Sequence, residues 1–349
     1  METHREVFTW VLGVLAEKGL LKGKTLGIDA TTLEANAALR TIVRRDTGEG
    51  YQEFLKRLAQ ESGIATPTRE QLARLDRKRA HKGSNEEWEH PHDPDARIAK
   101  MKDGRTHLAH KVEQAVDFSS GAVVAVTLQP ADRGDTASVR ETVCEAGEQI
   151  ATVGGEEKSE GVNPEGPKEV VLDKGYHSNE VLAELADWKV RSYCSEPERG
   201  RRRWEGKQEE QAAVYANRRR IRGERGKRLL RQRGEKLERS FAHLYETGGM
   251  RRVHLRRHPN ILKRLLVHVA AFNLGLVMRR LCGKGTPRGL QGCGADLLLS
   301  LLRLLTEAWA RELAPEGYRE SFPPNLGLPE PSNRPFLALV KKAVSTTDC

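Results

Sequence analysis

The sequence predicts a mixed α/β fold, in which a sheet is flanked by helices and a charged helical segment is inserted after the first strand. Two observations predict this class. Short apolar and β-branched runs alternate along the chain with segments of helical periodicity. The chain has 349 residues, of which 38% are hydrophobic, so it is long and apolar enough to bury a core.

The N-terminal third is expected to hold a helix, a strand and the insertion. Apolar residues recur at helical spacing from Phe8 to Leu15. The run T-L-G-I-D-A-T-T from Thr25 to Thr32 is typical of a buried strand, and the residues after it read as a helix or an irregular segment. Residues 48–102 are charged and helical in pattern, so we place this inserted arm outside the core.

The middle of the chain alternates strands and helices. The strand-like runs H-L-A-H-K-V-E-Q-A-V-D and G-A-V-V-A-V-T-L are joined by F-S-S-G, which predicts a hairpin. A helix follows, with Asp135 as its candidate N-cap. The short strand E-V-V-L, the helix S-N-E-V-L-A-E-L-A-D-W and the strand V-R-S-Y-C come next. We therefore expect one large domain over 1–282, and over 283–349 a linker, a short helix and a Pro-rich tail.

The positive charge of the chain is concentrated in one region. The whole chain has a net charge of +10, but residues 199–280 hold 24 Lys and Arg against 7 Asp and Glu, a net of +17. This asymmetry favours a polyanionic partner, nucleic acid before membrane, over a merely solvated basic helix face. The candidate phosphate-binding residues are Arg201, Arg202, Arg203, Arg218, Arg219, Arg220 and Arg222.

Several other classes are disfavoured. The longest apolar run, about 265–278, is shorter than the roughly 20 residues that span a bilayer, and no signal peptide is predicted, so we expect a cytoplasmic protein. The five cysteines include no C-x-x-C, which argues against a disulfide framework and a zinc site. His90, His92 and Asp93 lie in a Pro-containing loop and are interpreted as solvated.

Two aspartates are the first candidates for chemistry. Asp29 and Asp173 are expected at the ends of the two most convincing buried strands, where a carboxylate is held rigidly and still reaches solvent. Taken singly, each is better explained as a turn residue than as a metal ligand. A third acid would favour a metal site, and the basic region offers Glu235 and Glu238.

The surroundings of the two glutamates favour Glu238. Glu235 has Arg231 and Arg239 at four residues on either side to pair with it. Glu238 lies at the edge of an apolar stripe and has no cation at three or four residues in either direction. Three carboxylates can hold two divalent ions for phosphoryl transfer, and oxygen ligands favour Mg²⁺ or Mn²⁺.

The joint set of motifs carries a family resemblance. G-I-D-A-T-T-L-E-A-N, P-A-D-R-G-D-T, V-L-D-K-G-Y-H-S and E-R-S-F-A-H-L-Y-E-T-G-G-M-R-R, with the hairpin sequence, resemble the DDE transposases of bacterial insertion sequences, in the branch with D-x-G-Y. The resemblance covers about residues 7–290. It implies a ribonuclease H-like fold, metal-dependent cleavage and strand transfer on double-stranded DNA, and the triad Asp29, Asp173 and Glu238. It also implies that Tyr176 and Arg239 help to position DNA, and we expect a homo-oligomer in the active complex.

The sequence departs from the family pattern in two places. Members usually carry a helical region before the strand of the first aspartate, whereas 28 residues precede Asp29 here. Gly234 and Tyr245 stand where some relatives have Arg and Lys around the glutamate. Two alternatives therefore stay open: a catalytically inactive, N-terminally truncated DNA-binding remnant, and a ribonuclease H-like nuclease without strand transfer.

Overall fold

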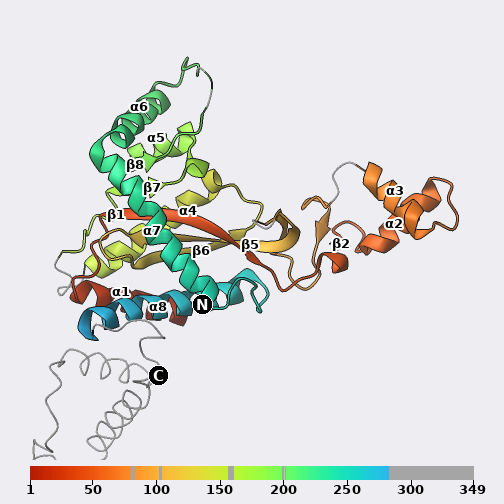
Figure 1. Ribbon diagram of the computed structural model, residues 1–349, viewed down its shortest axis with the longest axis horizontal. Coiled ribbons are helices and arrows are strands. Elements are labelled where there is room, and N and C mark those ends of the chain that lie inside the picture. The colour runs from red at the N-terminus through yellow and green to blue at the C-terminus, as the bar shows by residue number, and fades with distance from the viewer. Residues whose placement is uncertain (80–82, 102–103, 156–160, 199, 201, 283–349) are drawn as a thin grey trace, which may run out of the picture. The chain divides into compact units, whose positions relative to one another are not determined.

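A computed structural model describes residues 1–79, 83–101, 104–155, 161–198, 200 and 202–282. Met1–Leu274 form one compact unit, and Gly275–Cys349 form a second, of which only the last turns of one helix are described. In the first unit, helices pack on both faces of a six-stranded sheet (Figure 1). The predicted mixed α/β class with a ribonuclease H-like arrangement is confirmed.

The sheet combines an antiparallel half and a parallel half. Strand β1 pairs antiparallel with β5 and parallel with β7, and β7 pairs parallel with β8. The predicted hairpin is β5 and β6, and β4 pairs with the start of β5. The bounds are β1 (Thr25–Glu34), β4 (Arg97–Lys100), β5 (Thr106–Asp117), β6 (Val123–Pro130), β7 (Glu169–Leu172) and β8 (Arg191–Cys194).

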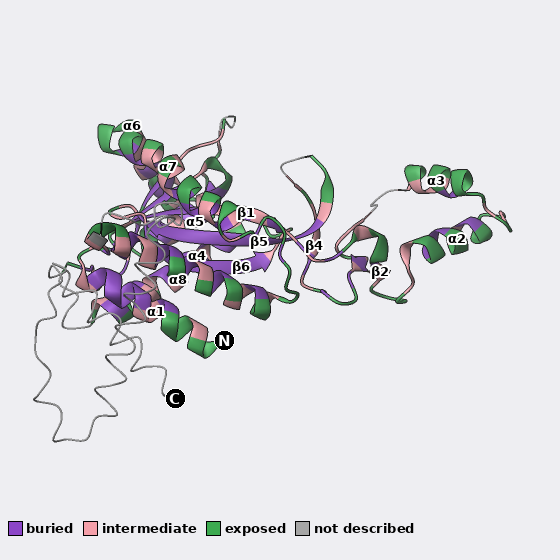
Figure 2. Cartoon of the chain, turned by 60° about the horizontal axis from the view of Figure 1, so that its bottom comes forward, coloured by how far each residue is buried: buried purple, intermediate pink, exposed green. Residues whose placement is uncertain are grey.

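The two faces of the sheet are covered by different helices. Helix α4 packs on one face against β5 and β6, and α1 packs on α4. Helix α7 crosses the other face, where it contacts β1, β5, β7 and β8 (Figure 1). Burial is concentrated in the sheet and in the helix faces turned to it (Figure 2). The helices are α1 (Glu2–Glu17), α4 (Asp135–Gly154), α5 (Asn179–Asp187), α6 (Gln208–Arg222), α7 (Glu224–Glu246) and α8 (His258–Cys282).

Two buried asparagines satisfy backbone groups of the outer strands. The Asn217 side chain on α6 accepts from Cys194 N at 2.9 Å and donates to Cys194 O at 2.8 Å. The Asn273 side chain on α8 does the same with Val123 of β6, at 2.9 and 2.7 Å. Because unpaired strand edges invite pairing with other chains, these amides both dock the helices and occupy edge groups.

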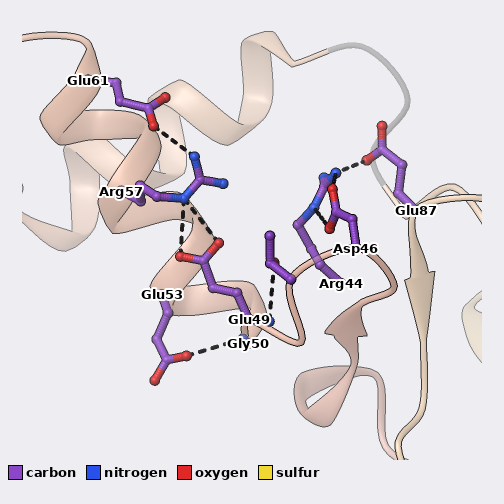
Figure 3. Close-up of polar contacts among 9 residues, drawn as sticks. Arg44, Asp46, Glu49, Gly50, Glu53, Arg57, Glu61 and Glu87 are labelled. Atoms are coloured by element: carbon purple, nitrogen blue, oxygen red, sulfur yellow. Dashed lines mark hydrogen bonds and ion pairs between the residues drawn. The ribbon is translucent and has the colours of Figure 1, made fainter.

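The inserted arm and the segment before it share an apolar cluster with Leu108 of β5. The elements of this region are η1 (Leu39–Thr41) and β2 (Val43–Arg44) before the arm, and α2 (Tyr51–Glu61), α3 (Arg69–Lys78) and β3 (Trp88–Glu89) within it. Phe54 and Trp88 lie at the centre of the cluster, with ring centroids 5.4 Å apart. The guanidinium of Arg44 lies over Phe54 and pairs with Asp46 and Glu87 (Figure 3). The insertion follows the first strand, as predicted, but its last part was wrongly placed outside the core, because Arg97–Lys100 form β4 and pair with β5. The segment before the arm is irregular rather than helical.

Three local predictions are corrected. Gly134, not Asp135, is the N-cap of α4, and the Asp135 carboxylate instead accepts from Lys111 Nζ at 2.6 Å. His90 and Asp93 are buried rather than solvated: Thr41 Oγ1 lies 3.1 Å from His90 Nε2, and Asp93 Oδ2 lies 3.2 Å from His110 Nε2. Over His258–Leu281, α8 is long and apolar enough to cross a membrane by length and composition alone; half of its most apolar window is buried, as in a core helix. The predicted C-terminal linker, helix and tail lie outside the described residues.

Candidate active site

Asp29 lies in the middle of β1, not at its end as predicted. Its side chain lies on the face of β1 where a Cβ added at Gly27 would meet Leu237 of α7, and it is directed toward α7. Oδ1 accepts from the Ala30 backbone N–H at 2.9 Å, which leaves Oδ2 for another partner. Burial raises the pKa of Asp29 above its ordinary value, against the opposing effect of the nearby Arg233 guanidinium.

Asp173 directly follows β7, as predicted. It is the N-cap of the turn Lys174–Tyr176, and its Oδ1 accepts from Lys174 N at 2.7 Å. Gly27 of β1 and Val171 of β7 are register partners in the parallel pair. Asp29 and Asp173 each lie two residues further along, so the register alone places the two carboxyls side by side on one face.

A cation from α7 joins the two carboxylates. Arg233 Nη1 lies 3.0 Å from Asp29 Oδ2, and Arg233 Nη2 lies 3.7 Å from Asp173 Oδ1. The Arg233 side chain is 17% exposed, so this is a partly buried ion-pair network rather than a surface contact.

The register between α7 and β7 explains why Arg233 reaches this point. Arg225 pairs with Glu169 at the start of β7, and Leu229 packs on Val171. Four helical residues rise about 6 Å and two strand residues about 6.6 Å, so the next pair in the series is Arg233 with Asp173. Sequence reasoning missed Arg233, although an arginine four residues after Leu229 and four before Leu237, inside an apolar stripe, is a usable signal.

The structure does not bring Glu238 to the two aspartates. Glu238 is exposed on α7. Glu235 pairs with Arg239 at 3.5 Å, as predicted for one of its two candidate partners. Among the described residues, no group of three or more His, Cys, Asp or Glu side chains is close enough to hold a metal ion. The assembled part of the predicted triad is therefore Asp29 with Asp173.

The donor set of this pair fits a divalent cation. One oxygen of each carboxylate already converges on a single positively charged group. Carboxylate oxygens are the ligands that Mg²⁺ and Mn²⁺ prefer, and the two side chains are 30% and 45% exposed, which leaves them accessible.

The predicted phosphate-binding arginines divide into two groups. Arg202 and Arg218 both pair with Glu196, at 2.6 Å, and Arg220 donates to Ser192 O at 2.8 Å. The exposed members are Arg203, Arg219, Arg222 and Arg239. Among the described residues, the side chain of Arg239 pairs with Glu235, and the side chains of the other three form no ion pair or hydrogen bond. Arg201 lies outside the described residues.

Tyr176 does not face the surface on which DNA was expected. Its side chain is buried, and its hydroxyl donates to Glu113 Oε1 at 2.8 Å on the α4 face of the sheet. The structure therefore shows no exposed Tyr176 hydroxyl for direct contact, and the implied role of Tyr176 in positioning DNA stays a prediction.

Comparison with known proteins gives a match to one family. A family model described as "Transposase DDE domain" matches residues 28–274, which begin next to Asp29 and include Asp173, Arg233 and Glu238. Searches of curated proteins and of solved structures returned no match. The matched region covers well over half of the chain and all of the sheet described above except the first three residues of β1, so this protein belongs to the DDE transposase family.

Proposed function

We propose that the protein is a DNA transposase that performs metal-dependent cleavage and strand transfer at the ends of an insertion sequence. Membership of the family supports DNA as the substrate. The observation that carries the proposal is the pair Asp29 and Asp173, held side by side by the strand register and sharing one cation. In this proposal the chain acts as a homo-oligomer on double-stranded DNA.

Asp29, Asp173 and Glu238 are the proposed ligands of Mg²⁺ or Mn²⁺. When bound, such ions activate an attacking water or hydroxyl and stabilise the leaving oxygen at phosphorus. Asp29 and Asp173 supply oxygens from rigid strands. Arg233 contacts the same oxygens, so it must withdraw as a divalent ion binds.

The path of α7 supports Glu238 as the third ligand. Leu237 lies against Gly27, and Tyr245 bonds Thr31. Eight helical residues rise about 12 Å and four strand residues about 13 Å, so the middle of this segment passes over Asp29. Glu238 lies one residue after Leu237, roughly 4.5 Å of rise before the middle of this segment at Phe241, so in this proposal its side chain would reach the aspartates through a change of rotamer.

The exposed arginines are the proposed DNA contacts. Arg219 and Arg222 stand at the end of α6 with no ion pair to any described residue, so they can release counterions from a phosphate backbone without first breaking a contact. Arg202 and Arg218 must first leave Glu196. Replacing Arg219 and Arg222 by Gln is expected to weaken DNA binding and to reduce the salt slope by about 2.

A cleavage assay on element-end DNA tests the proposal. Asp173→Asn is expected to abolish Mg²⁺-dependent cutting and strand transfer, and to leave DNA binding largely intact, because the substitution removes one ligand charge and keeps the shape. Asp187→Asn, which changes an exposed acid at the end of α5, is the matched control and should cut like wild type. Cutting by Asp173→Asn at the wild-type rate would show that the ligand assignment is wrong.

The same assay separates the alternatives. Salt-dependent DNA binding by wild type with no nicking in Mg²⁺ or Mn²⁺ would identify an inactive remnant. Cut ends that are never joined to a target would identify a nuclease without strand transfer.

A further inference from the structure

A buried carboxylate lies on the face of the sheet opposite α7. Glu113 of β5 is fully buried, and three hydroxyls donate to it: Tyr176 OH and Ser138 Oγ to Oε1, each at 2.8 Å, and Thr142 Oγ1 to Oε2. Burial raises the pKa of Glu113, and the three hydroxyl donors oppose that rise. A buried carboxylate is costly, and an apolar residue would usually serve the core as well, so stability alone does not account for it.

The neighbouring lysine extends this network to the turn after β7. Lys111 Nζ donates to Asp135 Oδ1 at 2.6 Å and to Ser138 Oγ at 2.9 Å, and Ser138 in turn donates to Glu113. Asp135 lies against Gly175, where an added Cβ would be 2.6 Å from Asp135 Oδ2. The turn therefore packs directly on the network, and a side chain at Gly175 would displace the Asp135 carboxylate.

The turn connects the network to Asp173. Tyr176 N donates to Asp173 O at 3.1 Å, and the same carbonyl accepts from the buried Cys194 thiol at 3.2 Å. Tyr176 is thus fixed by its side chain on Glu113 and by its backbone on Asp173. A shift of the Tyr176 ring would move the residue that carries the exposed carboxylate.

We propose that Glu113 and Tyr176 are positioning residues, which fix the Asp173 carboxylate for cation binding from the opposite side of the sheet. This inference rests on the proposed role of Asp173 as a metal ligand. Groups that orient ligand residues typically change metal affinity about 10–100-fold when removed. The Tyr176 hydroxyl touches no substrate, so its loss should act through Asp173 alone.

Tyr176→Phe tests the inference, because it removes one hydroxyl and keeps the ring. Tyr193→Phe is the matched control: Tyr193 on β8 is also buried, and its hydroxyl donates to the buried Glu169, at 3.4 Å, at the other end of β7. Mn²⁺ binding to the full chain is measured by electron paramagnetic resonance, together with DNA affinity and thermal unfolding. We expect Tyr176→Phe to weaken Mn²⁺ binding about tenfold with unchanged DNA affinity, and Tyr193→Phe to bind Mn²⁺ like wild type.

Two results would overturn the inference: Mn²⁺ affinity of Tyr176→Phe equal to that of wild type, or equal losses in both variants that follow their thermal stability. Asp173→Asn in the same titration keeps the two proposals apart. If Asp173→Asn loses Mn²⁺ binding and Tyr176→Phe does not, only the positioning role fails. If Asp173→Asn binds Mn²⁺ like wild type, the ligand assignment itself fails.

Discussion

Removing the positive charge of Arg233 should lower the stability of the protein, because Asp29 and Asp173 then lie side by side without a counter-charge. In Arg233→Gln, Asp29 and Asp173 keep their positions and lose their shared positive charge. The 3.0 Å contact to Asp29 is a charge-assisted hydrogen bond whose donor side chain is 17% exposed. Its removal should lower the free energy of unfolding by about 2 kcal/mol. The 3.7 Å contact to Asp173 is too long for a hydrogen bond and adds little.

Differential scanning fluorimetry with EDTA and with Mg²⁺ measures this effect. For a unit of this size, about 2 kcal/mol corresponds to a fall in Tm of about 4 °C in EDTA. Mg²⁺ should raise the Tm of Arg233→Gln more than that of wild type, because in wild type the ion must first displace the guanidinium.

Arg239→Gln is the control for the Arg233 experiment. It removes another arginine of α7, whose pair with Glu235 is solvent-exposed, so its Tm should change by less than about 1 °C in either condition. Equal Mg²⁺-induced shifts in wild type and Arg233→Gln would refute the idea that Arg233 and the ion compete for the same oxygens.

Two further substitutions test the packing of the site and the charge around it. Gly27→Ala places a Cβ 2.3 Å from the Phe118 ring and should cost about 1–3 kcal/mol in urea unfolding, whereas Gly147→Ala inside α4 has room and should be neutral or stabilising. Glu196→Gln should lower stability at pH 7, because hydrogen bonds from Arg218 lower the pKa of Glu196 in the folded state. The contribution of Glu196 to stability is therefore present above its ordinary pKa of 4.5 and is lost as the pH falls through the lower folded-state pKa. The difference in Tm from wild type should therefore close below pH 4.5, and a constant difference across this range would contradict the assignment.

Most of the sheet was predictable because its strands are bounded by local signals, whereas β4 was assigned to the inserted arm. The F-S-S-G turn and the apolar runs on either side specify β5 and β6, and E-V-V-L specifies β7. The irregular path before the arm was not resolved by periodicity, because packing against Phe54 and Trp88 decides it. The N-cap of α4 was misassigned because Asp135 is engaged by Lys111, a contact between distant segments that no local pattern encodes.

Of the three acids singled out from the sequence, the structure brings together two. Asp29 and Asp173 meet through the β1 and β7 register, although Asp29 lies in the middle of its strand, and the role of Glu238 stays a prediction. Arg233 and Glu113 were missed because each looks unremarkable in its own segment: one is an arginine among many, the other an acid in an alternating strand. Their roles arise only when α7 and α4 dock on opposite faces of the sheet.

The carboxylates on the two faces of the sheet are neutralised or hydrogen-bonded in different ways. One arrangement allows the counter-ion of the carboxylate to be exchanged, and the other holds the carboxylate in place. Asp29 is met by a guanidinium at a partly exposed position, so another cation can take over that charge. Glu113 is met by three hydroxyls in a closed interior, where no ion can enter without opening the core. The Asp29 carboxylate can therefore exchange its counter-charge, which is what a cation-dependent site requires, while Glu113 stays in a fixed network behind Asp173 that Lys111 joins through Ser138. Asp29, whose partner must change when a cation binds, is paired with the displaceable guanidinium of Arg233. Glu113, whose position must stay fixed, is held by neutral hydroxyl donors.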